Sequence, residues 1–119
     1  MPQYMLLIHG PADGGPSPEE LEAEMPRWFA YTDALREAGA LVAGEALEPP
    51  SGARTVRMRS GARQVTAGPV DERPDVLGGY YVIDVPDWEA AEAWAARIPS
   101  ASYGAVEIRP VLVFAESAA

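Results

Sequence analysis

The order of apolar patterns along the chain restricts its fold more than any other feature. Strand-like apolar runs occur at residues 3–10, 40–47, 54–66, 78–85 and 105–114, and the third of these reads as a hairpin. Helical spacing occurs after residue 17 and again after residue 87, so one helix follows the first strand and the other precedes the last. The order predicts an α+β fold of the ferredoxin-like β-α-β-β-α-β type with an added β-hairpin.

Helix-capping signals fix where both helices begin. Ser17, Pro18 and Glu20 form the pattern of a capping box, and Asp87 is a second N-cap candidate. The first helix carries an apolar stripe whose members lie three or four residues apart and are expected to face the core. Its members are Leu21, Met25, Trp28, Thr32 and Leu35. We assign Trp28 and Phe29 to core packing rather than to a ligand platform.

A chain of 119 residues is expected to form a single domain over residues 1–119. In the hairpin, a turn at Ser60-Gly61 places Val56 and Met58 on the same face as Arg54. Two helices can cover only one face of the main sheet, and a bare apolar sheet face is unusual on a monomer. We therefore expect a homodimer formed through the other sheet face.

Composition excludes several classes of function. The formal charge is −9, with nine basic residues, all arginine, which argues against nucleic acid or an anionic membrane as partner. There is no cysteine and His9 is the only histidine, so we expect no metal site and no cofactor. The N-terminal apolar run is too short for a signal peptide or a membrane span, and a cytoplasmic location is expected.

Five segments spread over the chain are distinctive: "YMLLIHG", "LREAGALVAGEAL", "VTAGP", "LGGYYVIDV" and "EAWAARIPSASYGAVEIRPV". Together they resemble the YCII-related family, and specifically its DGPF-type branch. The resemblance implies a dimeric α+β barrel and no assigned reaction, with a link of some members to extracytoplasmic-function sigma factors. The branch signature reads Ala67-Gly68-Pro69-Val70 here, so Ala67 replaces its aspartate and Val70 its phenylalanine. Shorter family members carry a histidine on the first helix, where this chain has Arg27 or Trp28.

His9 and Glu45 are the candidate catalytic residues. His9 ends the first strand, and histidine is the side chain whose ordinary pKa lies nearest neutrality, which suits a general acid or base. The alternative is a strand-end histidine bonded to backbone or solvent. Glu45 lies in an otherwise apolar strand, where a carboxylate should be paired or exposed to a cavity.

The candidate substrate-binding residues are Arg54, Gly68, Pro69, Tyr80, Tyr81 and Arg109. Either arginine could hold a substrate anion, although Arg109 could equally pair with Glu107 across one strand face. Tyr80 and Tyr81 point to opposite faces of their strand, and either could donate a hydrogen bond in a cavity. Gly68 and Pro69 lie in the stretch 65–81, which is too long for a tight turn and is expected to form the wall of a pocket or of a subunit contact. Within it, Asp71, Glu72 and Asp75 form either a pocket lid or a solvated acidic loop.

Two functional hypotheses follow. In the first, a cofactor-free dimer binds a small organic molecule in a cleft lined by His9, Glu45, Arg54, a tyrosine and Arg109, with isomerase- or lyase-like proton transfer. In the second, the protein is a non-catalytic interaction module that regulates a partner such as a sigma factor through its acidic surface and the loop 69–78. Retained polar groups on the dimer face would favour the first hypothesis, and an apolar, filled interface would favour the second.

Overall fold

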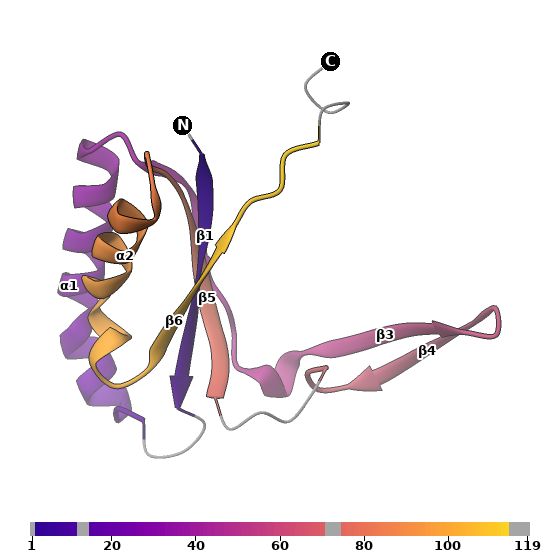
Figure 1. The fold of residues 1–119 in the computed structure, drawn as a ribbon. Helices are drawn as coiled ribbons and strands as arrows, with labels where there is room; N and C mark the ends of the chain where they lie inside the picture. Colours follow the sequence, from indigo (N-terminus) through magenta and orange to yellow (C-terminus); the bar gives the residue numbers. More distant parts are fainter. Residues whose placement is uncertain (1, 12–14, 71–74, 115–119) are drawn as a thin grey trace.

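The computed structural model describes residues 2–11, 15–70 and 75–114, and it contains a four-stranded antiparallel sheet (Figure 1). The strands are β1 (Gln3–Pro11), β2 (Leu41–Ala46), β5 (Asp75–Asp84) and β6 (Ala105–Pro110). Their order is β2-β5-β1-β6, so β5 and β1 form the centre of the sheet and β2 and β6 its edges. The predicted mixed α+β class is confirmed.

Both α-helices lie on one face of this sheet, as Figure 1 shows. Helix α1 spans Pro18–Glu37 and α2 spans Trp88–Ala96, and two short 3-10 helices, η1 (Pro50–Gly52) and η2 (Pro99–Ser102), lie between elements. The predicted capping box is confirmed, because the Glu20 amide donates to Ser17 Oγ at 3.1 Å and the Ser17 amide donates to Glu20 Oε1 at 3.0 Å. Asp87 accepts from the Ala90 amide at 2.9 Å. Neither helix is long and apolar enough to cross a membrane within the described ranges.

The predicted hairpin forms a separate two-stranded sheet that projects from the body of the protein (Figure 1). It consists of β3 (Arg54–Arg59) and β4 (Ala62–Ala67). Ser60 and Gly61 have φ angles of 52° and 76°, the left-handed pair that a tight two-residue hairpin turn requires. Val56 and Met58 share a face as expected, but each is 58% exposed. The hairpin therefore presents its apolar face to solvent.

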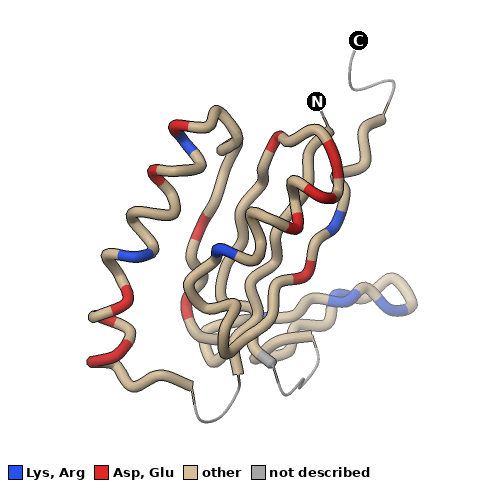
Figure 2. The backbone as a smooth tube through the Cα atoms, turned by 60° about the vertical axis from the view of Figure 1, so that its left-hand side comes forward, with Lys and Arg blue, Asp and Glu red and all other residues tan. Residues whose placement is uncertain are grey.

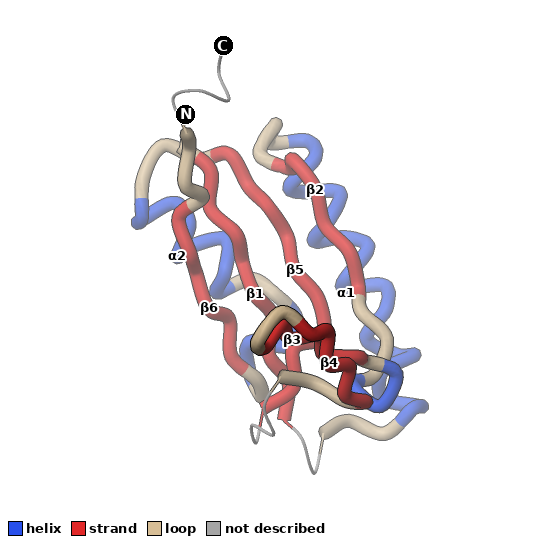
Figure 3. Tube along the Cα trace, turned by 90° about the vertical axis from the view of Figure 1, so that its right-hand side faces the viewer, coloured by secondary structure: helices blue, strands red, loops and turns tan. Residues whose placement is uncertain are grey.

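The core lies between the sheet and the two helices. Tyr4, Leu6 and Ile8 alternate along β1 and are buried against the helices, while Leu35 of α1 and Ile83 of β5 are fully buried. The intervening residues point to the opposite face, which lies in front of both helices in Figure 3 and which we call the open face. Its centre carries Met5, Leu7 and Val82, all partly buried. One apolar sheet face is thus covered by helices and the other is not.

Candidate functional site: a pocket between helix α1 and the sheet

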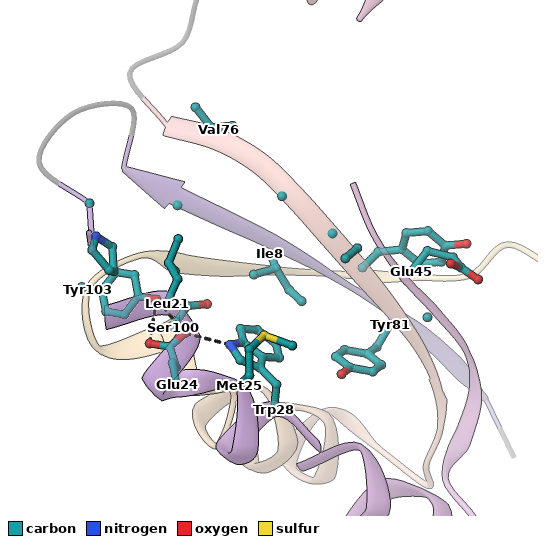
Figure 4. A pocket seen from close by; sticks show the side chains of 18 of the residues that line it. Ile8, Leu21, Glu24, Met25, Trp28, Glu45, Val76, Tyr81, Ser100 and Tyr103 are labelled. Carbon is teal, nitrogen blue, oxygen red and sulfur yellow. Dashed lines mark hydrogen bonds between the residues drawn. The ribbon is translucent and has the colours of Figure 1, made fainter. Parts of the chain in front are cut away.

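A pocket of about 600 Å³ lies between helix α1, over residues 21–32, and the strands β1, β2 and β5 (Figure 4). Helix η2 closes one end of it. The volume falls within the range of sites that bind small organic molecules. The walls are mostly apolar or aromatic and include Leu21, Met25, Trp28, Phe29 and Tyr81.

The pocket stays open because glycines take the place of larger side chains along part of the sheet beneath it. Gly44, Gly78 and Gly79 form part of its floor. A β-carbon added to Gly79 would lie 2.8 Å from the Glu45 carbonyl oxygen, and one added to Gly44 would lie 2.6 Å from Tyr81 Cδ1. Glycine is therefore required at both positions by close packing, and the space above the floor stays open.

The stripe of α1 that the sequence assigns to the core has two different environments. Leu35 is fully buried, whereas Leu21 and Met25 at the start of the helix are well exposed and face the pocket. Trp28 is half-buried, and Phe29 is 63% exposed, so its assignment to the core was wrong. The spacing of apolar residues along a helix predicts which side of the helix faces the sheet. It does not predict whether side chains of the sheet pack against that side.

Thr32 and Tyr81 form the polar contact at the centre of the pocket. Their hydroxyl oxygens lie 2.6 Å apart, and Thr32 Oγ1 also donates to the Trp28 carbonyl oxygen at 3.0 Å. A threonine hydroxyl has a single proton, so Thr32 accepts from the Tyr81 hydroxyl. The Tyr81 oxygen keeps its lone pairs for another donor.

Glu24 accepts hydrogen bonds from two other side chains at the η2 end of the pocket (Figure 4). Its Oε1 accepts from Trp28 Nε1 at 2.7 Å, and the Tyr103 hydroxyl lies 2.9 Å from each carboxylate oxygen. Desolvation, reinforced by the hydrogen bond to Glu24, raises the pKa of Tyr103 to about 12. Tyr103 therefore stays protonated and donates to Glu24 at neutral pH.

Ser100 of η2 lines the same end of the pocket. It is only 7% exposed, and its Oγ has no hydrogen-bond partner among the described residues. A buried hydroxyl without a partner is costly unless something else satisfies it. Its position therefore indicates a place where a bound molecule would gain a hydrogen bond.

Among the residues predicted from sequence, Tyr80, Tyr81 and Glu45 border the pocket. Tyr81 and its partner Gly44 face α1, so Tyr80 and its partner Glu45 direct their side chains to the open face. Figure 4 shows Glu45 and Tyr81 on opposite sides of the strand layer. The predicted division of the two tyrosines between the helix-packed side and the other face is confirmed.

His9 and Arg109 lie on the open face and do not line the pocket. His9 Nε2 is 3.4 Å from Glu107 Oε1, and Arg109 Nη1 is 3.6 Å from Glu107 Oε2. The His9 side chain is 13% exposed. The register places Glu45, Tyr80, Leu7 and Glu107 in one row across the four strands, so Glu45 and Glu107 are about 14 Å apart at three strand spacings.

Arg54, Gly68 and Pro69 lie at the base of the hairpin. Gly68 has a φ of 100°, its amide donates to the Ala53 carbonyl at 2.8 Å, and its own carbonyl accepts from Thr55 Oγ1 at 2.9 Å. Of the side chains that the sequence grouped in one cleft, His9, Glu45, Tyr80 and Arg109 thus share the open face, and Arg54 lies apart from them on the hairpin. Asp71 and Glu72 of the predicted lid lie outside the described residues, as does the side chain of Asp75.

The pocket residues that sequence reasoning missed are Glu24, Ser100 and Tyr103. Glu24, Trp28 and Thr32 follow one another at intervals of four residues and therefore lie on one side of the helix. A charged residue next to an apolar helical stripe was the signal that could have identified Glu24. Ser100 and Tyr103 follow Pro99, and no local sequence pattern indicates that this segment lies next to α1. Within the described parts of the chain, no group of three or more acidic, histidine or cysteine side chains could hold a metal ion.

The fold and pocket define a small α+β protein with a cavity between one helix and an antiparallel sheet. Residues 2–115 match the YCII-related domain, and the chain belongs to the YCII-related family. It is 33% identical over 100 residues to an uncharacterized protein of Rhizobium meliloti (strain 1021), an alignment that covers 82% of this chain and 81% of that protein.

Proposed function

We propose that this YCII-related protein binds a small organic molecule in the pocket between α1 and the sheet. The observation that carries the proposal is a cavity of about 600 Å³ with apolar and aromatic walls, a few converging polar groups and a glycine floor. Small-molecule sites have this composition. His9, the expected acid or base, lies on the other side of the sheet from this cavity, so the proposal is one of binding and assigns His9 no proton-transfer step in the pocket.

A matched pair of leucine variants tests this proposal. Leu21 and Leu47 are each 46% exposed, but only Leu21 lines the pocket. A thermal-shift screen of neutral, cationic and anionic organic molecules should yield ligands that stabilise the wild type by about 2.7 kcal/mol at a hundred times their Kd. Leu21→Ala should weaken binding by roughly fivefold through lost apolar contact, and Leu47→Ala should leave it unchanged. If no molecule in a broad library stabilises the protein, the proposal fails.

We also propose that the strand order is that of a ferredoxin-like fold and that two copies pair through the open face as a dimeric α+β barrel. Support comes from the partly buried apolar centre of that face around Met5, Leu7 and Val82. Further support comes from residues 111–114, an apolar segment beyond β6 whose side chains are exposed. Exposed apolar surface of this extent is typical of an interface.

Charge provides a second argument for pairing. The hairpin carries Arg54, Arg57, Arg59 and Arg63 and no acidic residue, in a chain whose net charge is −9. Figure 2 shows the acidic residues concentrated on the helices and the body of the sheet, and basic residues on the hairpin. A basic hairpin with an exposed apolar face complements the acidic body of a second copy.

Light scattering tests the dimer. We expect the wild type to have twice the mass of one chain, and we expect Leu7→Glu to be a monomer because it places a charge at the centre of the proposed interface. Ala30→Glu, on the exposed surface of α1, is the control and should remain dimeric. A monomeric wild type would exclude the barrel.

Membership of the DGPF-type branch is part of the proposal. The signature position lies at the end of β4, where Gly68 adopts a φ that favours glycine. That backbone role does not depend on the aspartate and phenylalanine that Ala67 and Val70 replace.

The exposed hairpin also favours a second candidate function, a regulatory module that contacts a protein partner such as a sigma factor. Capture of a hairpin-dependent partner by a dimer that binds no small molecule would support it.

A further inference from the structure

Apart from the Ser100 hydroxyl, the side-chain hydrogen-bond donors described below are already committed to acceptors within the protein. Trp28 Nε1 and the Tyr103 hydroxyl donate to Glu24, the Tyr81 hydroxyl donates to Thr32, and Thr32 donates to the Trp28 carbonyl. A ligand cannot use these donors without breaking a bond that the protein makes alone. The cost of leaving a buried partner unsatisfied is large compared with the net gain from one hydrogen bond.

The hydrogen-bond acceptors of the pocket still have free lone pairs. A carboxylate offers about four lone-pair sites, and two side chains donate to Glu24. The Tyr81 oxygen has given its proton to Thr32 and retains lone pairs. Ser100 Oγ, buried at the same end as Glu24, has no partner among the described residues. The cavity therefore presents several acceptor sites and one uncommitted side-chain donor, the Ser100 hydroxyl, to whatever it binds.

The charged side chains among the described residues that line the pocket are all negative. The ionised side chains among the described lining residues are Glu24, which lies in the cavity, and Glu45, which points to the open face at its edge. Arg27 does not line this cavity and lies instead in an adjacent hollow, together with Glu20, Glu24 and Tyr103. A bound anion would meet a carboxylate and no cation among the described residues that line the cavity, which is unfavourable in a partly desolvated site.

The walls suit an apolar cation. Trp28, Phe29 and Tyr81 present aromatic rings to the cavity, and aromatic faces attract ammonium groups. Tyr31 packs edge-on against Tyr81, with the ring centroids 5.4 Å apart, which holds the Tyr81 ring in place. An aryl or alkyl body would replace water along the apolar wall while a cationic head approached Glu24.

We propose that the ligand of this pocket is an apolar amine, with an aryl or alkyl body between α1 and the glycine floor and its ammonium group at Glu24 and Ser100. This inference rests on the proposed binding function and names the class of molecule that it takes. It assigns Glu24 as the residue that selects the charge of the ligand. Arg54 and Arg109, which the sequence offered as anion-binding residues, have no part in it.

A matched series of probes tests the inference: naphthylmethylamine, naphthalenemethanol and naphthoate, which share a body and differ in the head group. Titration calorimetry should show the amine binding at least about tenfold more tightly than the carboxylate, a difference of about 1.4 kcal/mol. Glu24→Gln should bring that ratio close to one, because the amide oxygen still accepts from Trp28 and Tyr103 while the charge and the second acceptor oxygen are lost. Glu22→Gln, an equal change of charge at an exposed position of α1 outside the pocket lining, should preserve the ratio.

Ser100→Ala provides an independent readout. It removes a hydroxyl that has no partner among the described residues, so the unliganded variant should be at least as stable as the wild type. Amine binding should weaken by about two- to tenfold.

The outcomes separate the two proposals. If the alcohol or the carboxylate binds as tightly as the amine, or if ligands found in the broad screen are anionic, the amine assignment is overturned while the pocket stands. A ratio unchanged by Glu24→Gln also overturns it. If nothing in the series or the screen binds, the binding function itself fails.

Discussion

Replacing Gly44 by alanine is the sharpest test of the pocket floor. The added β-carbon would lie 2.6 Å from Tyr81 Cδ1, 3.0 Å from Tyr81 Cε1 and 3.1 Å from the Tyr80 carbonyl oxygen. Carbon atoms in contact are normally about 3.5–4.0 Å apart, so the ring must move. The ring is held by the Thr32 hydroxyl at 2.6 Å and by the edge contact with Tyr31.

The expected free-energy change combines three effects. Overpacking costs about 1–3 kcal/mol. Displacing the Tyr81 hydroxyl from Thr32 costs about a further 1 kcal/mol. Alanine reduces the conformational entropy of the unfolded chain and returns about 0.4–1 kcal/mol. We therefore expect Gly44→Ala to lower the free energy of unfolding by about 1–3 kcal/mol and to weaken binding, since Tyr81 lines the pocket.

Chemical denaturation at a fixed protein concentration measures this change, because an oligomer has a concentration-dependent stability. Gly78→Ala is the matched control. Gly78 also lies on the pocket floor in β5, neither glycine has a positive φ, and its added β-carbon meets nothing closer than the Ile8 carbonyl oxygen at 3.9 Å. We expect no loss of stability there. Equal stabilities for the two variants would refute the argument that close packing, rather than strand propensity, requires Gly44.

Three further predictions follow from single contacts. Leu35→Ala empties a fully buried position and should lower the free energy of unfolding by about 2–5 kcal/mol, measured by denaturation; a loss below about 1 kcal/mol would contradict the described core. Ser17→Ala removes the N-cap of α1 and should cost about 0.5–2 kcal/mol, whereas Ser17→Thr should retain most of it. Desolvation first, and then Glu24, raise the pKa of Tyr103 from an ordinary value near 10 to about 12, so the protonated phenol favours the folded state fully below pH 10 and this contribution is lost as the pH rises through about 12. Phenolate absorbance, compared between wild type and Tyr103→Phe, should show this high-pH titration, and Glu24→Gln should shift it lower.

The elements of the fold could be predicted because their signals are local. The capping box at Ser17 and Glu20, the cap at Asp87 and the turn at Ser60-Gly61 each depend on a few adjacent residues, and the structure contains all of them. The assignment of the two tyrosines of β5 to opposite faces succeeded for the same reason, because side chains alternate along a strand.

The candidate site could be predicted only in part. Tyr81 was identified, and residues 76–81 border the pocket apart from Leu77. The structure places His9, Glu45 and Arg109 on one sheet face, whereas including Arg54 in their cleft required knowing where the hairpin and each strand would lie. Those positions depend on strand order and register between segments far apart in the chain, which no local pattern specifies.

The sequence alone determined the family, the α+β class, the caps and the hairpin turn, since each follows from adjacent residues or from long stretches of similarity. Only the tertiary structure decided that the first turns of α1 stand clear of the sheet and that glycines leave the floor open. It also decided that η2 brings Ser100 and Tyr103 to Glu24. These features arise from close approach of segments distant in sequence, where the space between backbones, and not the pattern of any one segment, sets what can bind.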